Sequence, residues 1–373
     1  MTSTASHERP QDYFPPRESH GGWRTNTDPA FLRSLGLDPA GIAALLAWNV
    51  AVPSTRWEPY DRYSASLVIK DGWLVGEAYN VPEARSFRQY LASNGKAFSI
   101  GLFGLLMEEG AAGRARYAVD LDSRLYDPRW LPEGWPLSDE RKEQILFAQV
   151  FTHTSGILPE DREQERNNPE VRDFVAYTVG HDPLHDEARP LCYDPGHPDL
   201  YGGDPYSSVA FNHLAIALPH LTGLPAHRYL EERLLEPVGI EAPDYHISPA
   251  WNPPGPGNRW ATCGALRLTP RDYARYAYLL LRDGVWEGRS LIPPGYLRRF
   301  TRSVDAPNIL SNAAGALGEG YPSDMFRISG SGLSMAFMIP SHDLIWLRTS
   351  RAPNELREEV VSHSLEMLFA AVC

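Results

Sequence analysis

The sequence predicts an α+β protein in which both ends of the chain build one antiparallel sheet, with a helical region inserted between them. Two β-hairpin patterns, at 64–80 and 332–350, lie near opposite ends of the chain. The stretch between them carries mainly helical patterns and Pro-rich loops. We therefore expect a sheet domain formed by residues 38–92 and 264–373, and a mostly helical domain with long loops formed by residues 93–263.

The N-terminal part combines an arm, a helix and a hairpin. Residues 1–37 are expected to form an extended arm, because Pro-containing breakers interrupt them. Asp38-Pro39 then begins a helix, with Pro at its first turn. The β-rich runs 64–70 and 73–80 follow, and the Asp71-Gly72 pair between them is a strong hairpin signal.

Helical patterns in the rest of the chain begin where a capping or turn residue precedes an amphipathic run. They lie at 138–156, 204–223, 225–240, 269–284 and 356–373. The last of these follows the second hairpin and is expected to close the fold as an amphipathic helix.

Composition limits the classes of function. A formal net charge of −12 and a pI near 5.5 argue against nucleic acid and anionic membranes as partners. The polar N-terminus does not resemble a secretory signal, and no run reaches the length of a transmembrane helix. Cys192, Cys263 and Cys373 are far apart, so we expect reduced thiols and a cytoplasmic protein. The histidines within 159–205 show no metal-ligand spacing, and we expect no metal or other cofactor.

The segment Ser93–Gly110, SNGKAFSIGLFGLLMEEG, is expected to form a helix that opens with an S-x-x-K motif. In a helix, Ser93 and Lys96 lie on one face, one turn apart. A Ser hydroxyl needs a nearby base to become a nucleophile, and a Lys can serve when its surroundings lower its pKa. The chain has only three lysines among its 35 Lys and Arg residues, and an Arg here would stay protonated. We therefore expect Ser93 to be a nucleophile and Lys96 its base.

Further segments, ordered along the chain, resemble the serine β-lactamase and penicillin-binding-protein superfamily. They are Phe151–Ile157 (FTHTSGI), Cys192–Gly196 (CYDPG), Tyr206–Ser208 (YSS) and 264–292. The resemblance runs from about residue 40 to the end of the chain. It is closest to the class C β-lactamase-like esterases and amide hydrolases, which include family VIII carboxylesterases and 6-aminohexanoate-dimer hydrolase. It implies a β-lactamase/transpeptidase-like fold.

The resemblance also implies a reaction and its participants. Ser93 would accept an acyl group, and Lys96 would activate it. Tyr206 would share protons with Lys96 and act as acid or base toward the leaving group and water. The oxyanion hole would combine the Ser93 N–H with one N–H from the strand edge near 330–334. The substrate would be a small ester or amide.

Two departures from the family pattern affect the substrate-binding end. Ser208 stands where the family has an Asn, and a hydroxyl offers one donor instead of two. The third motif, with Lys or His in relatives, has neither in the local sequence FRISGSGLSMAFMIP. The carboxylate anchor of β-lactamases and peptidases is therefore expected to be missing, which favours an esterase or short-amide hydrolase.

Two alignments of the third motif remain open. Counting back from Pro340, Ser331-Gly332-Leu333 takes the place of the motif, and Ser334 N–H becomes the oxyanion donor. Ile328-Ser329-Gly330 is the competing alignment. Arg327 is a nearby source of positive charge.

Other conspicuous residues receive simpler interpretations. His153 is expected to be a buried structural residue, as in the resembled family, and His213 a core or surface residue. Trp251, Trp260 and Trp286 are candidates for lining an apolar acyl pocket. Two other functions stay open: an acyltransferase that passes the acyl group to an alcohol or amine, and a non-catalytic protein that keeps the fold. Oligomeric state is open as well.

Overall fold

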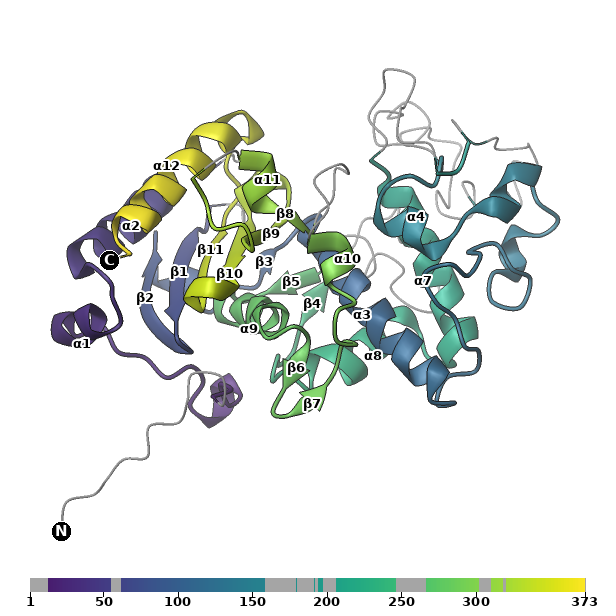
Figure 1. Cartoon of the computed structure of the whole chain (residues 1–373), viewed down its shortest axis with the longest axis horizontal. Helices are drawn as coiled ribbons and strands as arrows, with labels where there is room; N and C mark the ends of the chain where they lie inside the picture. The colour runs from purple at the N-terminus through teal and green to yellow at the C-terminus, as the bar shows by residue number, and fades with distance from the viewer. Residues whose placement is uncertain are drawn as a thin grey trace, which may run out of the picture.

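A six-stranded sheet with the strand order β2-β1-β11-β10-β9-β8 forms one half of the molecule (Figure 1). All its strand pairings are antiparallel. The computed structural model describes residues 13–54, 62–157, 206–245, 266–301, 310–317 and 320–372, with 179, 191 and 194–196. The strands are β1 (Ala65–Lys70), β2 (Trp73–Tyr79), β8 (Leu310–Asn312), β9 (Phe326–Ser329), β10 (Met335–Ile339) and β11 (Leu344–Thr349).

The pairing of β1 with β11 joins the two ends of the chain inside the sheet, with Leu67 opposite Leu347. Asp71 and Gly72 both have positive φ, as the predicted tight turn between β1 and β2 requires. The α+β class, with a sheet built from both chain ends, is therefore confirmed.

Two hydrophobic cores cover the two faces of this sheet. Leu67 and Leu347 face a core that contains α9 (Pro270–Leu281), whereas Val68 and Trp346 face α2 (Pro39–Ala51) and α12 (Arg357–Ala370). This alternation follows from the period of two residues in a strand. Figure 1 shows α2 and α12 side by side on one face and α9 on the other.

The helix α3 (Asn94–Ala111) links the sheet half to the helical half and is buried on nearly all sides. Phe98 stacks on Tyr276 of α9, with ring centroids 3.7 Å apart, and Gly101 leaves room for the Tyr276 hydroxyl. Beyond α3 lie α4 (Phe147–Phe151), α7 (Ser208–Thr222) and α8 (Ala226–Leu230), which continues through a π-helical turn (Figure 1). The helix predicted for 93–110 is thus present, and its apolar run is buried between the two halves.

A small sheet crosses the domain borders proposed from the sequence. Its strands are β3 (Gln89–Tyr90), β5 (Leu266–Leu268) and β4 (Asp244–Tyr245), in that order. The division at residues 93 and 263 therefore remains a proposal. The remaining short elements are α10 (Arg298–Thr301), α11 (Ala313–Leu317) and the hairpin of β6 (Val285–Trp286) with β7 (Arg289–Ser290).

The expectation of an extended arm over 1–37 is wrong for residues 29–34, which form α1 (Pro29–Ser34). The carboxylate of Asp28 accepts the N–H groups of Ala30 and Phe31, and Pro29 occupies the first turn. The same Asp-Pro signal correctly predicted α2, but at Asp28-Pro29 it was interpreted as a break within an extended arm.

The continuous helix expected over 138–156 is also wrong. Asp139 caps a short 3₁₀ turn at Glu140–Gln144, and α4 follows separately. Between them, the Ile145 carbonyl accepts the Leu125 N–H, and the Phe147 N–H donates to the Ser123 carbonyl. Hydrogen bonds to the preceding loop thus replace the helical ones.

Within the described ranges, no helix is both long and apolar enough to cross a bilayer. The three cysteines, and the histidines expected to be loop residues within 159–205, lie outside these ranges.

Asp272, in the first turn of α9, is expected to make stability depend on pH. It is 5% exposed, and burial raises its pKa to about 6 despite the nearby Arg275. The folded state therefore holds this proton more tightly than the unfolded state, so the contribution to stability is full below about pH 4 and is lost as the pH rises through 6. Asp272→Asn should raise the free energy of unfolding at pH 8 by about 1–3 kcal/mol relative to wild type.

Urea unfolding at several pH values measures this difference. The gain should shrink between pH 6 and pH 4, because wild-type Asp272 becomes protonated there. A gain of equal size at pH 4 and pH 8 would contradict the assignment of the titration to Asp272.

Candidate active site

Ser93 stands at a strained junction before α3. The preceding Ala92 has a φ of 49°, a left-handed conformation that is costly for a residue with a Cβ. Ser93 is the N-cap residue, yet its side chain makes no capping hydrogen bond. N-cap serines usually use their hydroxyl to accept a helical N–H. Here the hydroxyl is left available for another partner.

That partner is Lys96, whose Nζ lies 3.3 Å from Ser93 Oγ. The same Nζ lies 2.7 Å from Tyr206 Oη and 2.7 Å from Ser208 Oγ. Lys96 is only 1% exposed, so three hydroxyl oxygens surround a buried amine. The structure thus brings together the four residues expected from the S-x-x-K and Y-S-S segments.

Tyr206 and Ser208 are positioned by the start of α7. Ser207 caps this helix through a hydrogen bond from the Ala210 N–H, and its own N–H donates to Nδ1 of His153. The His153 ring stacks on Tyr206, with centroids 4.2 Å apart. Burial holds the pKa of His153 well below its usual value, and a positive charge on Lys96 would lower it further. A neutral His153 thus supports the position of Tyr206.

Asn94, which sequence reasoning missed, anchors the start of α3 beside Ser93. It is fully buried, and its Nδ2 donates to the carbonyls of Leu91 and Ser334. Its Oδ1 accepts a hydrogen bond from the Tyr273 hydroxyl of α9. One side chain thus ties the start of α3 to β10 and α9. The only sequence signal was an Asn beside the proposed nucleophile.

The chain between β9 and β10, residues 330–334, lies directly against Ser93's neighbours. A Cβ on Gly330 would lie 2.5 Å from Asn94 Nδ2 and 3.0 Å from the Leu91 carbonyl. Gly330 is therefore the glycine that permits close approach to α3, in keeping with the Ile328-Ser329-Gly330 alignment. Ser334 is fully buried, and its Oγ donates to the Ser350 carbonyl.

Arg357, at the first position of α12, also reaches this turn. Its guanidinium donates to Ser329 Oγ at 2.7 Å and to the Gly330 carbonyl at 2.8 Å. Burial lowers the pKa of Arg357, the nearby Arg327 lowers it further, and Tyr206 opposes this shift. Sequence reasoning missed Arg357. Its one signal was a cation at a helix N-terminus, where the macrodipole disfavours positive charge.

Other predicted residues lie elsewhere. Trp286 packs against Phe14 and Tyr278 in the core, with ring centroids 5.2 and 6.1 Å apart, so its expected role in an acyl pocket is wrong. His213 is fully buried and lies 2.9 Å from the Tyr126 hydroxyl, so it is a core residue. Trp251 and Trp260 lie outside the described residues.

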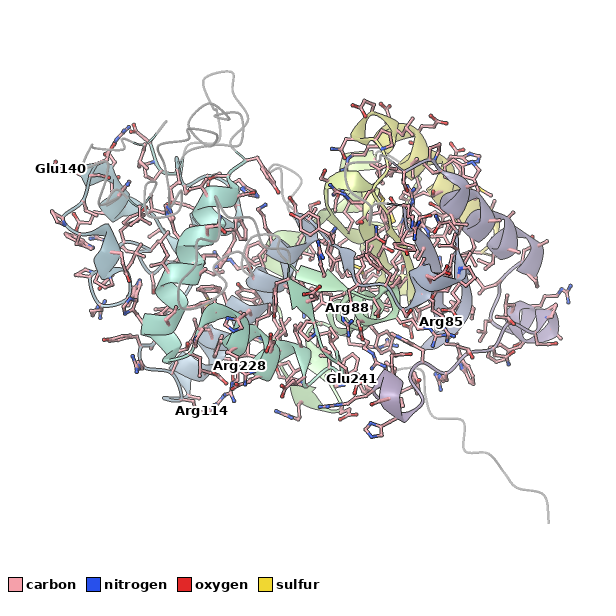
Figure 2. The ribbon with its side chains drawn as sticks, turned by 180° about the vertical axis from the view of Figure 1, so that it is seen from behind. Arg85, Arg88, Arg114, Glu140, Arg228 and Glu241 are labelled. Carbon is pink, nitrogen blue, oxygen red and sulfur yellow. The ribbon has the colours of Figure 1, made fainter. Side chains whose placement is uncertain are left out.

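The arrangement suits nucleophilic chemistry, because a hydroxyl, an amine and a phenol lie within proton-transfer distance in a water-poor setting. In contrast to the buried Lys96, the charged residues Arg114, Glu140 and Arg228 lie exposed on the surface of the helical half (Figure 2).

Comparisons with known proteins point to one family and one fold. Residues 55–366 match the sequence profile of the family described as Beta-lactamase. No curated protein sequence matches the chain.

Solved structures with the same fold cover almost the whole chain. A penicillin-binding protein homologue from Caulobacter crescentus has a TM-score of 0.60 and 17% identity, covering 89% of this chain and 97% of that one. EstCE1, described as a hydrolase with promiscuous acyltransferase activity, has a TM-score of 0.60 and 13% identity, covering 90% and 99%. A candidate 6-aminohexanoate-dimer hydrolase from Bacillus anthracis has a TM-score of 0.56 and 17% identity, covering 95% and 97%. At these identities the likeness shows the fold alone.

Gly330→Ala should lower the free energy of unfolding by about 1–3 kcal/mol, because the added methyl group overlaps Asn94 and the Leu91 carbonyl. Denaturant unfolding measures the effect, and Glu355→Ala at an exposed position nearby is the control. Equal stability of Gly330→Ala and wild type would contradict the close approach.

Proposed function

The chain belongs to the beta-lactamase family, and on this premise we propose that it is a serine hydrolase that cleaves an ester or a short amide through an acyl-enzyme on Ser93. The observation that carries the proposal is the set of distances from Lys96 Nζ: 3.3 Å to Ser93, 2.7 Å to Tyr206 and 2.7 Å to Ser208.

The geometry supports Lys96 as the base. A neutral amine has two N–H groups and one lone pair. With the two N–H groups directed to the nearer oxygens of Tyr206 and Ser208, the lone pair is left for the hydroxyl proton of Ser93. Ser208 thus helps to orient the amine, a role that does not require the Asn found in the resembled family.

In the proposed reaction, Ser93 Oγ attacks the substrate carbonyl and its proton passes to Lys96. Tyr206 then gives a proton to the departing alcohol or amine as the bond to the carbonyl carbon breaks, and Lys96 can restore that proton through their 2.7 Å hydrogen bond. An ester on Ser93 remains. Water attacks this ester, its proton returns through the same residues, and a carboxylic acid leaves.

The oxyanion is proposed to bind two backbone N–H groups, one from Ser93 and one from residues 330–334. The close approach of Gly330 to Asn94 supports the Ile328-Ser329-Gly330 alignment. It makes the Ser331 N–H, which follows Gly330, the preferred donor. The alternative donor is the N–H of Ser334, the residue whose carbonyl accepts the hydrogen bond from Asn94.

Incubation with a fluorophosphonate or p-nitrophenyl acetate tests the proposal. Mass spectrometry should show one adduct on Ser93 in wild type and none in Ser93→Ala, with turnover reduced about 10³-fold or more. Lys96→Arg should lower turnover comparably, because a guanidinium stays protonated. A folded wild-type protein that forms no adduct would exclude both the hydrolase and an acyltransferase, and would favour a non-catalytic role.

Acyl transfer to an alcohol or amine is the alternative enzymatic outcome, and it uses the same acyl-enzyme. EstCE1, a protein of the same fold, is described as having promiscuous acyltransferase activity. Product analysis with added alcohol or amine acceptors separates the two: hydrolysis releases the free acid, whereas transfer yields a new ester or amide.

The positive charges of Arg327 and Arg357 beside the site favour an anionic substrate, although the third motif lacks the Lys or His that anchors a substrate carboxylate in relatives. Among the described residues, Arg327 and Arg357 form no ion pair, and Arg327 has no hydrogen-bond partner. Arg327 is desolvated, which lowers its pKa. Arg327 is only partly buried, but its Nε is buried without a partner, and a partly desolvated guanidinium without a carboxylate attracts an anionic ligand. We extend the proposal to esters or amides that carry an acidic group.

Arg327→Gln should therefore lower kcat/KM about 10-fold for a p-nitrophenyl ester with a free carboxylate, and little for its methyl-ester counterpart. Arg289→Gln, an exposed position on β7, is the matched control. Equal losses for both substrates would rule out charge recognition by Arg327.

A further inference from the structure

The turn between β9 and β10 has an unfavourable backbone conformation that contacts from elsewhere in the chain must stabilise. Gly332 has a φ of 76° and Leu333 a φ of 58°, so two successive residues adopt the left-handed conformation. For Leu333 this conformation costs about 1–2 kcal/mol. Such a conformation persists only when surrounding contacts impose it.

The contacts come from the segment that leads from β11 into α12. Asn354 Oδ1 accepts the Gly332 N–H at 3.1 Å, and its Nδ2 donates to Ser331 Oγ at 3.2 Å. Arg357 donates to Ser329 Oγ and to the Gly330 carbonyl, at 2.7 and 2.8 Å. Between them, these two side chains bind four consecutive residues of the turn.

The two side chains also support one another, since Arg357 donates to Asn354 Oδ1 at 3.3 Å. On the other side of the turn, the Gly332 carbonyl accepts hydrogen bonds from Ser350 Oγ and the Ala352 N–H. The turn is therefore fixed from the C-terminal segment of the chain.

The opposite side of the turn faces the nucleophile. Gly330 lies against Asn94 and Leu91, and the Ser334 carbonyl accepts the Asn94 side chain. Ser93 lies between Leu91 and Asn94 in sequence. A shift of the turn would therefore move its N–H groups relative to the carbonyl that Ser93 attacks. An error of about 1 Å in such a position can cost about 10²-fold in rate.

We propose that Asn354 and Arg357 are positioning residues that clamp residues 329–332 and thereby hold the oxyanion-binding N–H of this turn against Ser93. The proposal rests on the acyl-enzyme function proposed above. Neither side chain needs to touch the substrate for this role. The planar guanidinium of Arg357 donates to Ser329 and Gly330 at the same time, and the single ammonium group of a Lys cannot replace both hydrogen bonds.

The test compares Asn354→Ala, Arg357→Ala and Arg357→Lys with wild type. Each should lower kcat for p-nitrophenyl acetate about 10- to 100-fold, while KM changes less than about threefold. Affinity for phenylboronic acid, whose adduct with Ser93 mimics the tetrahedral intermediate, should fall by a similar factor. Guanidinium chloride at low millimolar concentration should partly restore Arg357→Ala. Glu355→Ala, exposed between the two positions, is the control and should behave as wild type.

Thermal unfolding separates positioning from a purely structural role. At the assay temperature the variants should remain folded, so the loss of kcat must exceed any unfolded fraction. Wild-type kcat in both alanine variants, or full recovery in Arg357→Lys, would overturn the clamp. A wild-type protein that forms no Ser93 adduct would instead overturn the proposed function, so the two failures are distinguishable.

Discussion

The buried amine of Lys96 is the constraint on which the rest of the site depends. A fully desolvated amine must be surrounded by polar partners, and here it is held by hydroxyls of Ser93, Tyr206 and Ser208. These residues come from the starts of α3 and α7, and Lys96 and Tyr206 are 110 residues apart in sequence. Each helix must therefore begin at a fixed place relative to the other. The stacking of His153 on Tyr206 and the anchoring of Asn94 serve this requirement.

The sheet meets the start of α3, beside Ser93, through the turn between β9 and β10. Because β11 pairs with β10, the segment after β11 lies beside this turn, although it is far from α3 in sequence. The segment after β11 can then supply Asn354 and Arg357 to one side of the turn, while Asn94 holds the other side. The antiparallel topology thus places two distant segments on opposite sides of one short loop.

Much of the fold was accessible from local sequence signals. The resemblance to the serine β-lactamase superfamily, the two hairpins and the helices α2, α3, α7, α9 and α12 are confirmed. The errors arose where a local signal was misinterpreted or overridden by tertiary contacts. Asp28-Pro29 was interpreted as a chain break, whereas Asp28 caps α1. The helix expected over 138–156 was divided because Ile145 and Phe147 bond to the loop that precedes it, which no local pattern encodes.

The sequence by itself determined how Ser93 and Lys96 lie relative to each other, because an S-x-x-K motif in a helix places them one turn apart by local geometry. It also indicated Tyr206, through a resemblance. The tertiary structure alone decided what surrounds them: the amine shared among three hydroxyls, the close approach of Gly330, and the guanidinium of Arg357 at the turn. These contacts join residues separated by 27 to more than 200 positions. Local propensity carries no information about contacts between residues so far apart in sequence, since these contacts depend on how the strands pair and the helices pack.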